Sequence, residues 1–324
     1  MSEGETNVVA MIGGTICLIA GLIMLGWLIR RIAQGNQFTK DVRAENKVVI
    51  VTGSSGGIGK ETALDLASRG ATVYMACRDM QKCEQARLQI IDKTKNSKVY
   101  ARKLDLASLE SVRNFVKEFL EEEERLDILI NNAGVMNLPR WETEDGFEMQ
   151  LGVNHLGHFL LTNLLLDTLK ASAPSRIVVV ASMVYSLGVI RKDDLNSKKS
   201  YNKFTAYFQS KLANVLFAKE LSKRLEGTGV TCNSLHPGVV QTELMRYQTI
   251  VSKLVIPFRI CLKSPKSGAQ TQLMVALDPD LEKVSGKYFE NCTMEEESSV
   301  AKDDEMAKWL WNKSVEWTKS DQRF

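Results

Sequence analysis

The chain has 324 residues, enough for one large domain or two small ones with a sizeable hydrophobic core. Hydrophobic residues make up 44% and charged residues 25%, values that exclude collagen-like and intrinsically disordered chains. A net charge of +3 gives no support for nucleic-acid binding, and six scattered cysteines exclude a dense disulfide framework.

The N-terminal part contains an uncharged apolar segment at residues 8–29, which reads VVAMIGGTICLIAGLIMLGWLI. At about 1.5 Å per residue, a helix of this length spans roughly 33 Å, enough to cross the hydrocarbon core of a bilayer. A cleaved signal peptide is one alternative, but Glu3 and Glu5 stand where positive charges are expected. A buried core helix is the other alternative. The segment therefore predicts a transmembrane signal anchor.

Positive charges follow this segment and set its expected orientation. Arg30 and Arg31 come directly after it, and further lysines and arginines outnumber the acids up to residue 47. The positive-inside rule then places residues 1–7 in the lumen and the rest of the chain in the cytosol. Residues 30–44 are expected to form a polar linker, and residues 45–324 one folded domain.

Short β-branched runs alternate with helical patterns after residue 45. Strands are expected at Lys47–Thr52, Ala71–Ala76, Val99–Leu104, Leu126–Ile130, Arg176–Ala181, Val230–Leu235 and Gly286–Phe289. Helices are expected at Gly57–Arg69, Asp79–Lys93, Leu106–Glu124, Phe147–Ala171 and Lys203–Leu225. This alternation predicts a mostly parallel α/β sheet of about seven strands, with helices on both faces. Ligands of such sheets bind beyond the carboxyl ends of the strands.

The turn after the first expected strand is rich in glycine and opens a helix. It reads Thr52-Gly53-Ser54-Ser55-Gly56-Gly57-Ile58-Gly59. Glycines let the backbone approach a pyrophosphate closely, and a helix N-terminus favours an anion. The spacing differs from the common G-x-G-x-x-G, so a glycine-rich turn without a ligand is the alternative. The position within a βαβ unit favours a dinucleotide site.

The end of the second strand bears on which dinucleotide binds. NAD sites usually carry an acidic residue there, which accepts from the ribose 2′-hydroxyl. Cys77 stands at that position, and Arg78 follows with a guanidinium suited to a 2′-phosphate. This pattern favours NADP(H). In the alternative, Arg78 is solvated and Asp79 caps the next helix or accepts partly from a 2′-hydroxyl.

Tyr207 and Lys211 are four residues apart on an expected helix, and therefore lie on one face. A nearby ammonium lowers the pKa of a phenol, which is about 10 in a free tyrosine. We therefore expect Tyr207 to act as a general acid or base near neutral pH. The alternative is an amphipathic helix with an ordinary exposed lysine.

These motifs occur in an ordered set with Asn131-Asn132-Ala133-Gly134, Asn154, Ser182 and Pro237-Gly238. The set resembles the short-chain dehydrogenase/reductase family over essentially residues 45–290. The stretches Ala76-Cys77-Arg78-Asp79, VNHLGHFLL at 153–161 and SKLANVL at 210–216 look like the membrane-anchored, NADPH-linked retinol/retinaldehyde dehydrogenases. The resemblance implies a single Rossmann-type, doubly wound catalytic domain over residues 45–324. An insertion between Ser182 and Tyr207 and the alanine at position 181 depart from most of the family.

The resemblance also implies roles for individual residues. Tyr207 exchanges a proton with the substrate oxygen, and Ser182 donates a hydrogen bond to that oxygen. Lys211 lowers the pKa of Tyr207 and binds the nicotinamide ribose, and Asn154 holds a water that links Lys211 to solvent. The residues expected around the cofactor are Gly53, Ser55, Gly57, Ile58, Gly59, Arg78, Asp105, Leu106, Asn132, Ala133, Gly134, Tyr207, Lys211, Pro237, Gly238, Val240 and Thr242.

An apolar segment follows Thr242, where the family places its substrate-covering part. It reads LMRYQTIVSKLVIPFRICLKS at residues 244–264, which suits a hydrophobic lid or an interfacial helix. Coverage of the core is the alternative. Together with the expected anchor, a lid predicts a lipophilic substrate such as a retinoid, a long-chain aldehyde or an isoprenoid.

Two residue pairs are expected to be structural. His155 and His158 are three residues apart but lack a visible third ligand, so no metal is expected. Cys77 and Cys83 are expected to fill the core as small side chains, with a redox pair as the alternative.

The combined prediction is a membrane-anchored, NADPH-dependent oxidoreductase that interconverts a lipophilic alcohol and its aldehyde or ketone. Retinol and retinaldehyde are the favoured pair, with reduction favoured in cells. A steroid, isoprenoid or long-chain fatty-aldehyde reductase is one alternative, and a catalytically silent NADPH-binding scaffold or redox sensor is another. The expected location is the endoplasmic reticulum membrane, with the mitochondrial membrane or a lipid droplet as alternatives. Homodimers are common in the family.

Overall fold

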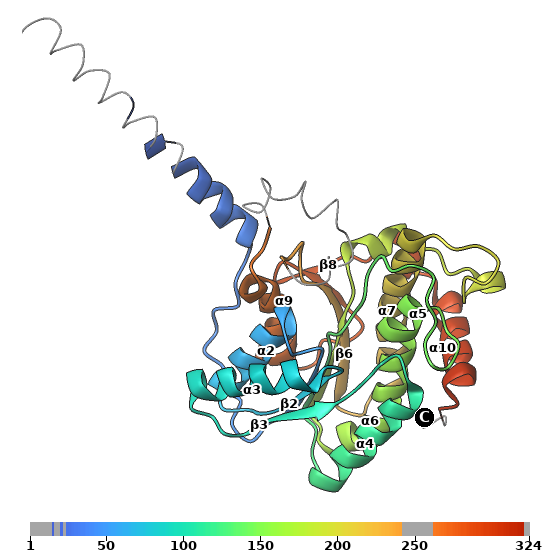
Figure 1. The fold of residues 1–324 in the computed structure, drawn as a ribbon, viewed down its shortest axis with the longest axis horizontal. Helices are drawn as coiled ribbons and strands as arrows, with labels where there is room; N and C mark the ends of the chain where they lie inside the picture. Colours follow the sequence, from blue (N-terminus) through green and yellow to red (C-terminus); the bar gives the residue numbers. More distant parts are fainter. Residues whose placement is uncertain (1–14, 16–19, 22–23, 242–261, 321–324) are drawn as a thin grey trace, which may run out of the picture.

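The computed structural model describes residues 15, 20–21, 24–241 and 262–320. In this part of the chain an eight-stranded sheet has the order β3-β2-β1-β4-β5-β6-β7-β8 (Figure 1). Neighbouring strands are parallel up to β7, and β8 is antiparallel to β7. The strands are β1 (Val48–Thr52), β2 (Thr72–Cys77), β3 (Val99–Lys103), β4 (Ile128–Asn131), β5 (Ser175–Val180), β6 (Val230–His236), β7 (Tyr288–Glu290) and β8 (Thr293–Glu295).

Helices cover both faces of the sheet and enclose a hydrophobic core on each face, the second core being made of two clusters. One face carries α2 (Gly57–Ser68), α3 (Met80–Thr94) and α9 (Pro265–Leu277). The other carries α4 (Leu109–Glu122), α6 (Gly157–Ala171) and α7 (Lys203–Arg224), with α10 (Asp304–Thr318) packed outside α7. Along β1, Val49 and Val51 face the first core and Ile50 faces the second, because alternate side chains of a strand point to opposite faces. The predicted α/β class is thereby confirmed.

The sheet has one more strand than expected. The predicted strand at Gly286–Phe289 appears as β7, two residues further along the chain. The additional strand, β8, has three residues, and all of them are exposed. Three residues are too few for an alternating pattern to stand out, so the sequence cannot reveal this strand.

The long helix expected at Phe147–Ala171 is interrupted. It begins with α5 (Met149–Leu151), passes through a π-helical turn, η1 (Gly152–Leu156), and continues as α6. In the π turn the N–H of Gly157 donates to the carbonyl of Gly152, five residues earlier. Asn154 lies in the middle of this turn. Single π turns inside α-helices occur frequently at functional sites.

The N-terminal region is described in part. Residues 24–34 are helical, and Met24, Trp27 and Ile32 on this helix are exposed. Its end is tied to the domain, because the Gln34 side chain donates to the Leu262 carbonyl (3.2 Å). Within the described residues, no helix has both the length and the apolar character that a membrane span needs. Most of the expected span at residues 8–29, and the expected lid up to residue 261, lie outside the described residues.

The start of α6 gives a test of packing. A Cβ at Gly157 would lie 2.6 Å from the Leu106 carbonyl oxygen and 2.9 Å from the Leu106 Cβ. We expect Gly157→Ala to lower the free energy of unfolding by about 1–3 kcal/mol, because the loop after β3 must shift. Chemical denaturation measures this loss.

Gly56→Ala is the matched control for this substitution. A Cβ at Gly56 meets nothing within 4 Å, and the residue has extended backbone. Only the preference for glycine over alanine at a helix N-cap is lost, so we expect less than about 1 kcal/mol. Equal losses in the two variants would contradict the steric argument.

Candidate active site

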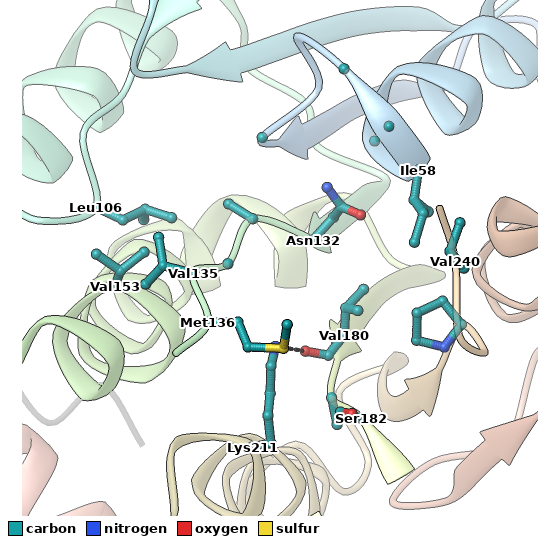
Figure 2. A pocket seen from close by; sticks show the side chains of 18 of the residues that line it. Ile58, Leu106, Asn132, Val135, Met136, Val153, Val180, Ser182, Lys211 and Val240 are labelled. Carbon is teal, nitrogen blue, oxygen red and sulfur yellow. Dashed lines mark hydrogen bonds between the residues drawn. The ribbon is translucent and has the colours of Figure 1, made fainter. Parts of the chain in front are cut away.

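A cavity of about 670 Å³ lies at the carboxyl ends of β1, β2, β4, β5 and β6. This is the edge where open α/β sheets bind their ligands. Its lining includes all of the expected cofactor residues except Thr242, which lies outside the described residues. Figure 2 shows Ile58, Asn132, Val180, Ser182, Lys211 and Val240 around it.

The glycine-rich turn packs closely against the end of β4. Gly53 has a φ of +66°, and a Cβ there would lie 2.9 Å from the Ala133 Cα, so glycine is required. The Thr52 hydroxyl accepts from the N–H groups of Asn132 and Ala133, each at 2.9 Å. Gly56, at the N-cap of α2, has no side chain to cap the helix. The N-terminal N–H groups of α2 therefore suit a pyrophosphate.

The end of β2 forms another part of the cavity. The Asp79 carboxylate accepts from the Lys82 N–H (3.1 Å) and caps α3, as the capping alternative expected. Arg78 is exposed and lines the cavity together with Lys82. The Lys103 ammonium donates to the Arg78 carbonyl (2.7 Å) and fixes the backbone at this point. The cationic side chains at this end of the cavity suit a phosphate.

The pair Cys77 and Cys83 is buried, as expected of small core side chains. Both are free thiols, with 2.8 Å between their sulfur atoms.

Three polar side chains meet at the carboxyl end of β5. Ser182 follows this strand, and its hydroxyl faces Tyr207 closely enough to lower the pKa of the phenol. Lys211 lies one turn beyond Tyr207 on α7, and its ammonium donates to the Val180 carbonyl at 3.1 Å (Figure 2). A Cβ on Gly134 would lie 3.6 Å from the Lys211 Nζ, so this ammonium faces the loop after β4. The structure thus brings Ser182, Tyr207 and Lys211 to one cavity.

The acid–base properties differ from the sequence-based expectation. Burial raises the pKa of Tyr207 to about 12, and the hydrogen bond with Ser182 acts in the opposite direction. Burial lowers the pKa of Lys211 to about 8. The expected lowering of the Tyr207 pKa by Lys211 is wrong for this geometry. The ammonium lies over the Tyr207 ring, 5.8 Å from its centroid, and donates to a backbone carbonyl instead of the phenol.

Asn154 uses its side chain to hold the loop that lines the cavity. Its Oδ1 accepts from the Val135 N–H (2.8 Å), and its Nδ2 donates to the Val135 carbonyl (3.0 Å) and to the Ser210 hydroxyl (2.9 Å). The amide is therefore occupied by protein partners. The backbone carbonyl is a second acceptor, besides the remaining lone pair of Oδ1, at which Asn154 can hold a water.

Several apolar lining residues were not expected from the sequence. Phe204 and Phe208 lie on α7 with Tyr207 and Lys211, in an i, i+3, i+4, i+7 pattern that faces the cavity. This helical spacing is the signal that could have identified them. Other apolar additions include Leu104, Val135, Met136, Val153, Val180, Met183, Val184 and Val239.

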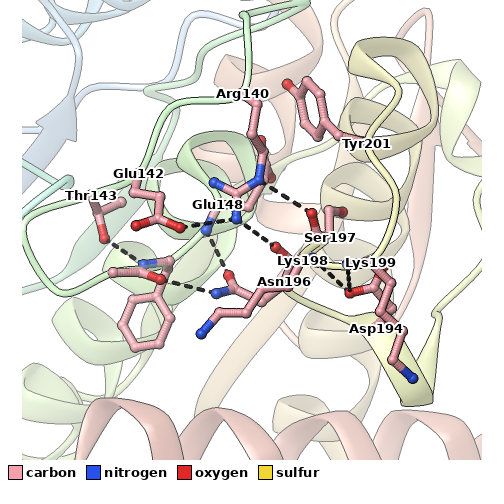
Figure 3. Close-up of polar contacts among 12 residues, drawn as sticks. Arg140, Glu142, Thr143, Glu148, Asp194, Asn196, Ser197, Lys198, Lys199 and Tyr201 are labelled. Atoms are coloured by element: carbon pink, nitrogen blue, oxygen red, sulfur yellow. Dashed lines mark hydrogen bonds and ion pairs between the residues drawn. The ribbon is translucent and has the colours of Figure 1, made fainter.

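The insertion between Ser182 and Tyr207 packs against the loop at 137–148 (Figure 3). Arg140 donates to the carbonyls of Ser197 (3.2 Å) and Asn196 (3.3 Å). The Asn196 side chain accepts from the Glu148 N–H (2.6 Å) and donates to the Gly146 carbonyl (2.9 Å). These contacts join the insertion to the segment that follows the cavity residues Met136 and Asn137.

The parallel sheet, the phosphate-binding turn and the Ser–Tyr–Lys cluster together define a nicotinamide-dependent oxidoreductase. A family model described as short chain dehydrogenase matches residues 47–250. The chain is 53% identical over 295 residues to "Retinol dehydrogenase 13" from Homo sapiens, with 89% of each chain covered.

Two crystal structures are also similar. An uncharacterized protein from Mycobacterium paratuberculosis is 36% identical, with a TM-score of 0.73 and coverage of 89% of this chain and 100% of that chain. An NAD(P)-dependent gluconate 5-dehydrogenase from Beutenbergia cavernae with bound NADP is 25% identical, with a TM-score of 0.63 and coverage of 77% and 96%. The chain belongs to the short-chain dehydrogenase family and is an NAD(P)-dependent enzyme acting on CH–OH donors.

The burial of Lys211 predicts a pH-dependent effect on stability. Its pKa is about 8 in the folded protein and near 10.5 in the unfolded chain, so the unfolded chain binds more protons between these values. Below pH 8 the buried ammonium lowers the free energy of unfolding by its full cost. This cost disappears as the pH rises from 8 toward 10.5. We therefore expect Lys211→Met to be more stable than the parent at pH 7, by about 1–3 kcal/mol.

Chemical denaturation at pH 7 and at pH 10 tests this expectation. The Val180 carbonyl keeps a donor in the variant, because Asn214 Nδ2 also donates to it (3.1 Å). Lys203→Met, on the exposed first turn of α7, is the control and should show no comparable change with pH. A Lys211→Met protein that is less stable at pH 7 would contradict the argument.

Proposed function

We propose that the protein is a membrane-anchored, NADPH-dependent reductase of lipophilic aldehydes, with retinaldehyde as the favoured substrate and retinol as its product. The observation that carries the proposal is the apolar lining that surrounds the Ser182–Tyr207 pair. Met136, Met183 and Phe208 contribute to this lining, which suits a hydrocarbon chain ending in one carbonyl group. The similarity to a retinol dehydrogenase supports the same substrate class.

The preference for NADPH is supported at the end of β2. Arg78 and Lys82 provide positive charge at the cavity, while Asp79 is used to cap α3. An arginine at this position suits a ribose 2′-phosphate, and an unengaged acid would suit a 2′-hydroxyl. The solved relative with bound NADP supports a cofactor of this kind.

The residues of the cavity suit a carbonyl reduction. When bound, the cofactor supplies the hydride that reaches the carbonyl carbon. Ser182 holds the carbonyl oxygen, and Tyr207 delivers the proton that converts the developing alkoxide to an alcohol. Lys211 places a positive charge behind Tyr207, next to the loop at Gly134 where the nicotinamide ribose is expected. The high pKa of Tyr207 keeps the phenol protonated at neutral pH, the form that can give a proton to the product oxygen.

Delivery of the substrate from a bilayer is supported by the N-terminal helix. Residues 24–34 carry exposed apolar side chains, and Gln34 contacts the segment at 262–264. In that segment the Lys263 N–H donates to the carbonyl of Val239, a cavity residue (2.9 Å). The helix therefore meets the domain close to the cavity. We propose an endoplasmic reticulum anchor with the domain in the cytosol, consistent with Arg30 and Arg31.

Turnover of all-trans-retinaldehyde by detergent-purified protein tests the function. We expect oxidation of NADPH, and a loss of at least about 100-fold in kcat in Tyr207→Phe, because the proton donor is removed. Binding of NADPH should persist in that variant. Tyr100→Phe, at an exposed tyrosine of the edge strand β3, is the control and should retain full activity.

Other results would redirect the proposal. Turnover only with steroids, isoprenoids or long-chain aldehydes would favour those substrates. Binding of NADPH without turnover of any carbonyl would favour the silent scaffold or redox sensor.

The cofactor preference has its own test. We expect Arg78→Gln to raise the KM for NADPH by about tenfold and to leave the KM for NADH within about twofold, because only NADPH carries the 2′-phosphate. Steady-state kinetics with both cofactors measures the two values. Arg87→Gln, on α3 but paired with Glu84 outside the cavity lining, is the control. If Arg78→Gln raised the KM values for NADPH and NADH by the same factor, a contact between Arg78 and the 2′-phosphate would be contradicted.

A further inference from the structure

His158 is a buried histidine next to the candidate site, with no role in the reaction described above. It lies in the first turn of α6 and is 2% exposed. Its Nε2 is 2.9 Å from the Thr52 hydroxyl, and its Nδ1 is 3.1 Å from the Asn154 carbonyl oxygen. The imidazole thus bridges the glycine-rich turn and the π turn.

The partners of Thr52 determine which nitrogen of His158 carries the proton. The Thr52 oxygen has two lone pairs, and it already accepts from the N–H groups of Asn132 and Ala133. It therefore has no lone pair for a third donor, and its own proton is directed to the His158 Nε2 at 2.9 Å. The Ile130 carbonyl, at 3.4 Å, is the more distant acceptor. His158 is consequently the Nδ1–H tautomer and donates to the Asn154 carbonyl.

Burial keeps this tautomer over the working range of pH. Burial lowers the pKa of His158 to about 4, and the charge of Lys211 lowers it further, while the bond to the Asn154 carbonyl acts in the opposite direction. The ring is therefore neutral around pH 7, with a single proton on Nδ1.

We propose that His158 is a positioning residue that fixes the backbone carbonyl of Asn154 and ties it to the cofactor-binding turn through Thr52. The Asn154 side chain is held by Val135 and Ser210, so the direction of its carbonyl depends on the π turn and on this hydrogen bond. A carbonyl oxygen that accepts from Nδ1–H keeps a second lone pair for a water. The inference rests on the proposed function, in which that water resupplies protons to Lys211.

Two substitutions separate the two ends of the imidazole. In His158→Asn the amide reaches the position of Nδ1, so it keeps the bond to Asn154 and leaves the Thr52 proton to the Ile130 carbonyl. In His158→Gln the longer amide reaches the position of Nε2, so it keeps the bond to Thr52 and loses the bond to Asn154. Both variants replace the same ring with a neutral amide. A larger loss in His158→Gln than in His158→Asn therefore reports the Asn154 bond, and the reverse order reports the Thr52 bond.

We expect kcat for retinaldehyde reduction to stay within about threefold of the parent in His158→Asn and to fall about tenfold in His158→Gln, the effect of one hydrogen bond. The KM values for NADPH and retinaldehyde should change by less than about twofold in both. The ratio of kcat in H₂O to kcat in D₂O should rise only in His158→Gln, because proton resupply becomes slower there.

His155→Gln is the matched control. His155 is a buried histidine of the π turn that precedes α6, but its Nε2 is 2.8 Å from the Ser314 hydroxyl of α10, away from the cavity. It should lower thermal stability without changing the isotope ratio. Equal losses of kcat in His158→Asn and His158→Gln, or an unchanged isotope ratio in His158→Gln, would overturn the proposal.

A parent protein that turns over no carbonyl would disprove the proposed function, but the positioning role of His158 would remain testable. Hydrogen exchange of residues 152–159 in the presence of NADP⁺ then gives the answer. Faster exchange in His158→Gln than in His158→Asn would support the role, and identical exchange would overturn it.

Discussion

The hydroxyl of Thr52 joins the parts of the molecule on which the site depends. It accepts two N–H groups from the loop after β4, and so holds that loop against the glycine-rich turn after β1. Its proton is directed to His158, which contacts the π turn at Asn154. A buried hydroxyl with all three hydrogen-bonding positions filled is costly to rearrange. The phosphate-binding turn, the loop at the ribose and the helix that carries Asn154 are thereby kept in one arrangement.

Much of the fold and of the candidate site could be predicted from the sequence, because the signals are local. The strand at Val48–Thr52 is a continuous β-branched run, and the turn that follows has glycines where the backbone must approach its neighbour closely. The spacing of Tyr207 and Lys211 on one helix face also survives in the structure. Each of these signals depends on residues close together in the chain, which a pattern can capture.

The features that could not be predicted depend on contacts between distant segments. The π turn at Gly152–Leu156 adds one residue to a helix whose hydrophobic pattern looks continuous. The pKa of Tyr207 depends on its burial and on where the Lys211 ammonium points, and neither follows from their spacing. The same is true of Arg140 and Asn196, whose contacts join two loops that are far apart in the sequence (Figure 3).

The polar strand β8 also has a consequence for assembly. Its three residues are all exposed, and Glu295 at its end is followed by Glu296 and Glu297. If two copies paired along this strand, carboxylates of both chains would be brought close together, and like charges on neighbouring strands repel. The strand therefore terminates the sheet and protects this side of the molecule from edge-to-edge aggregation.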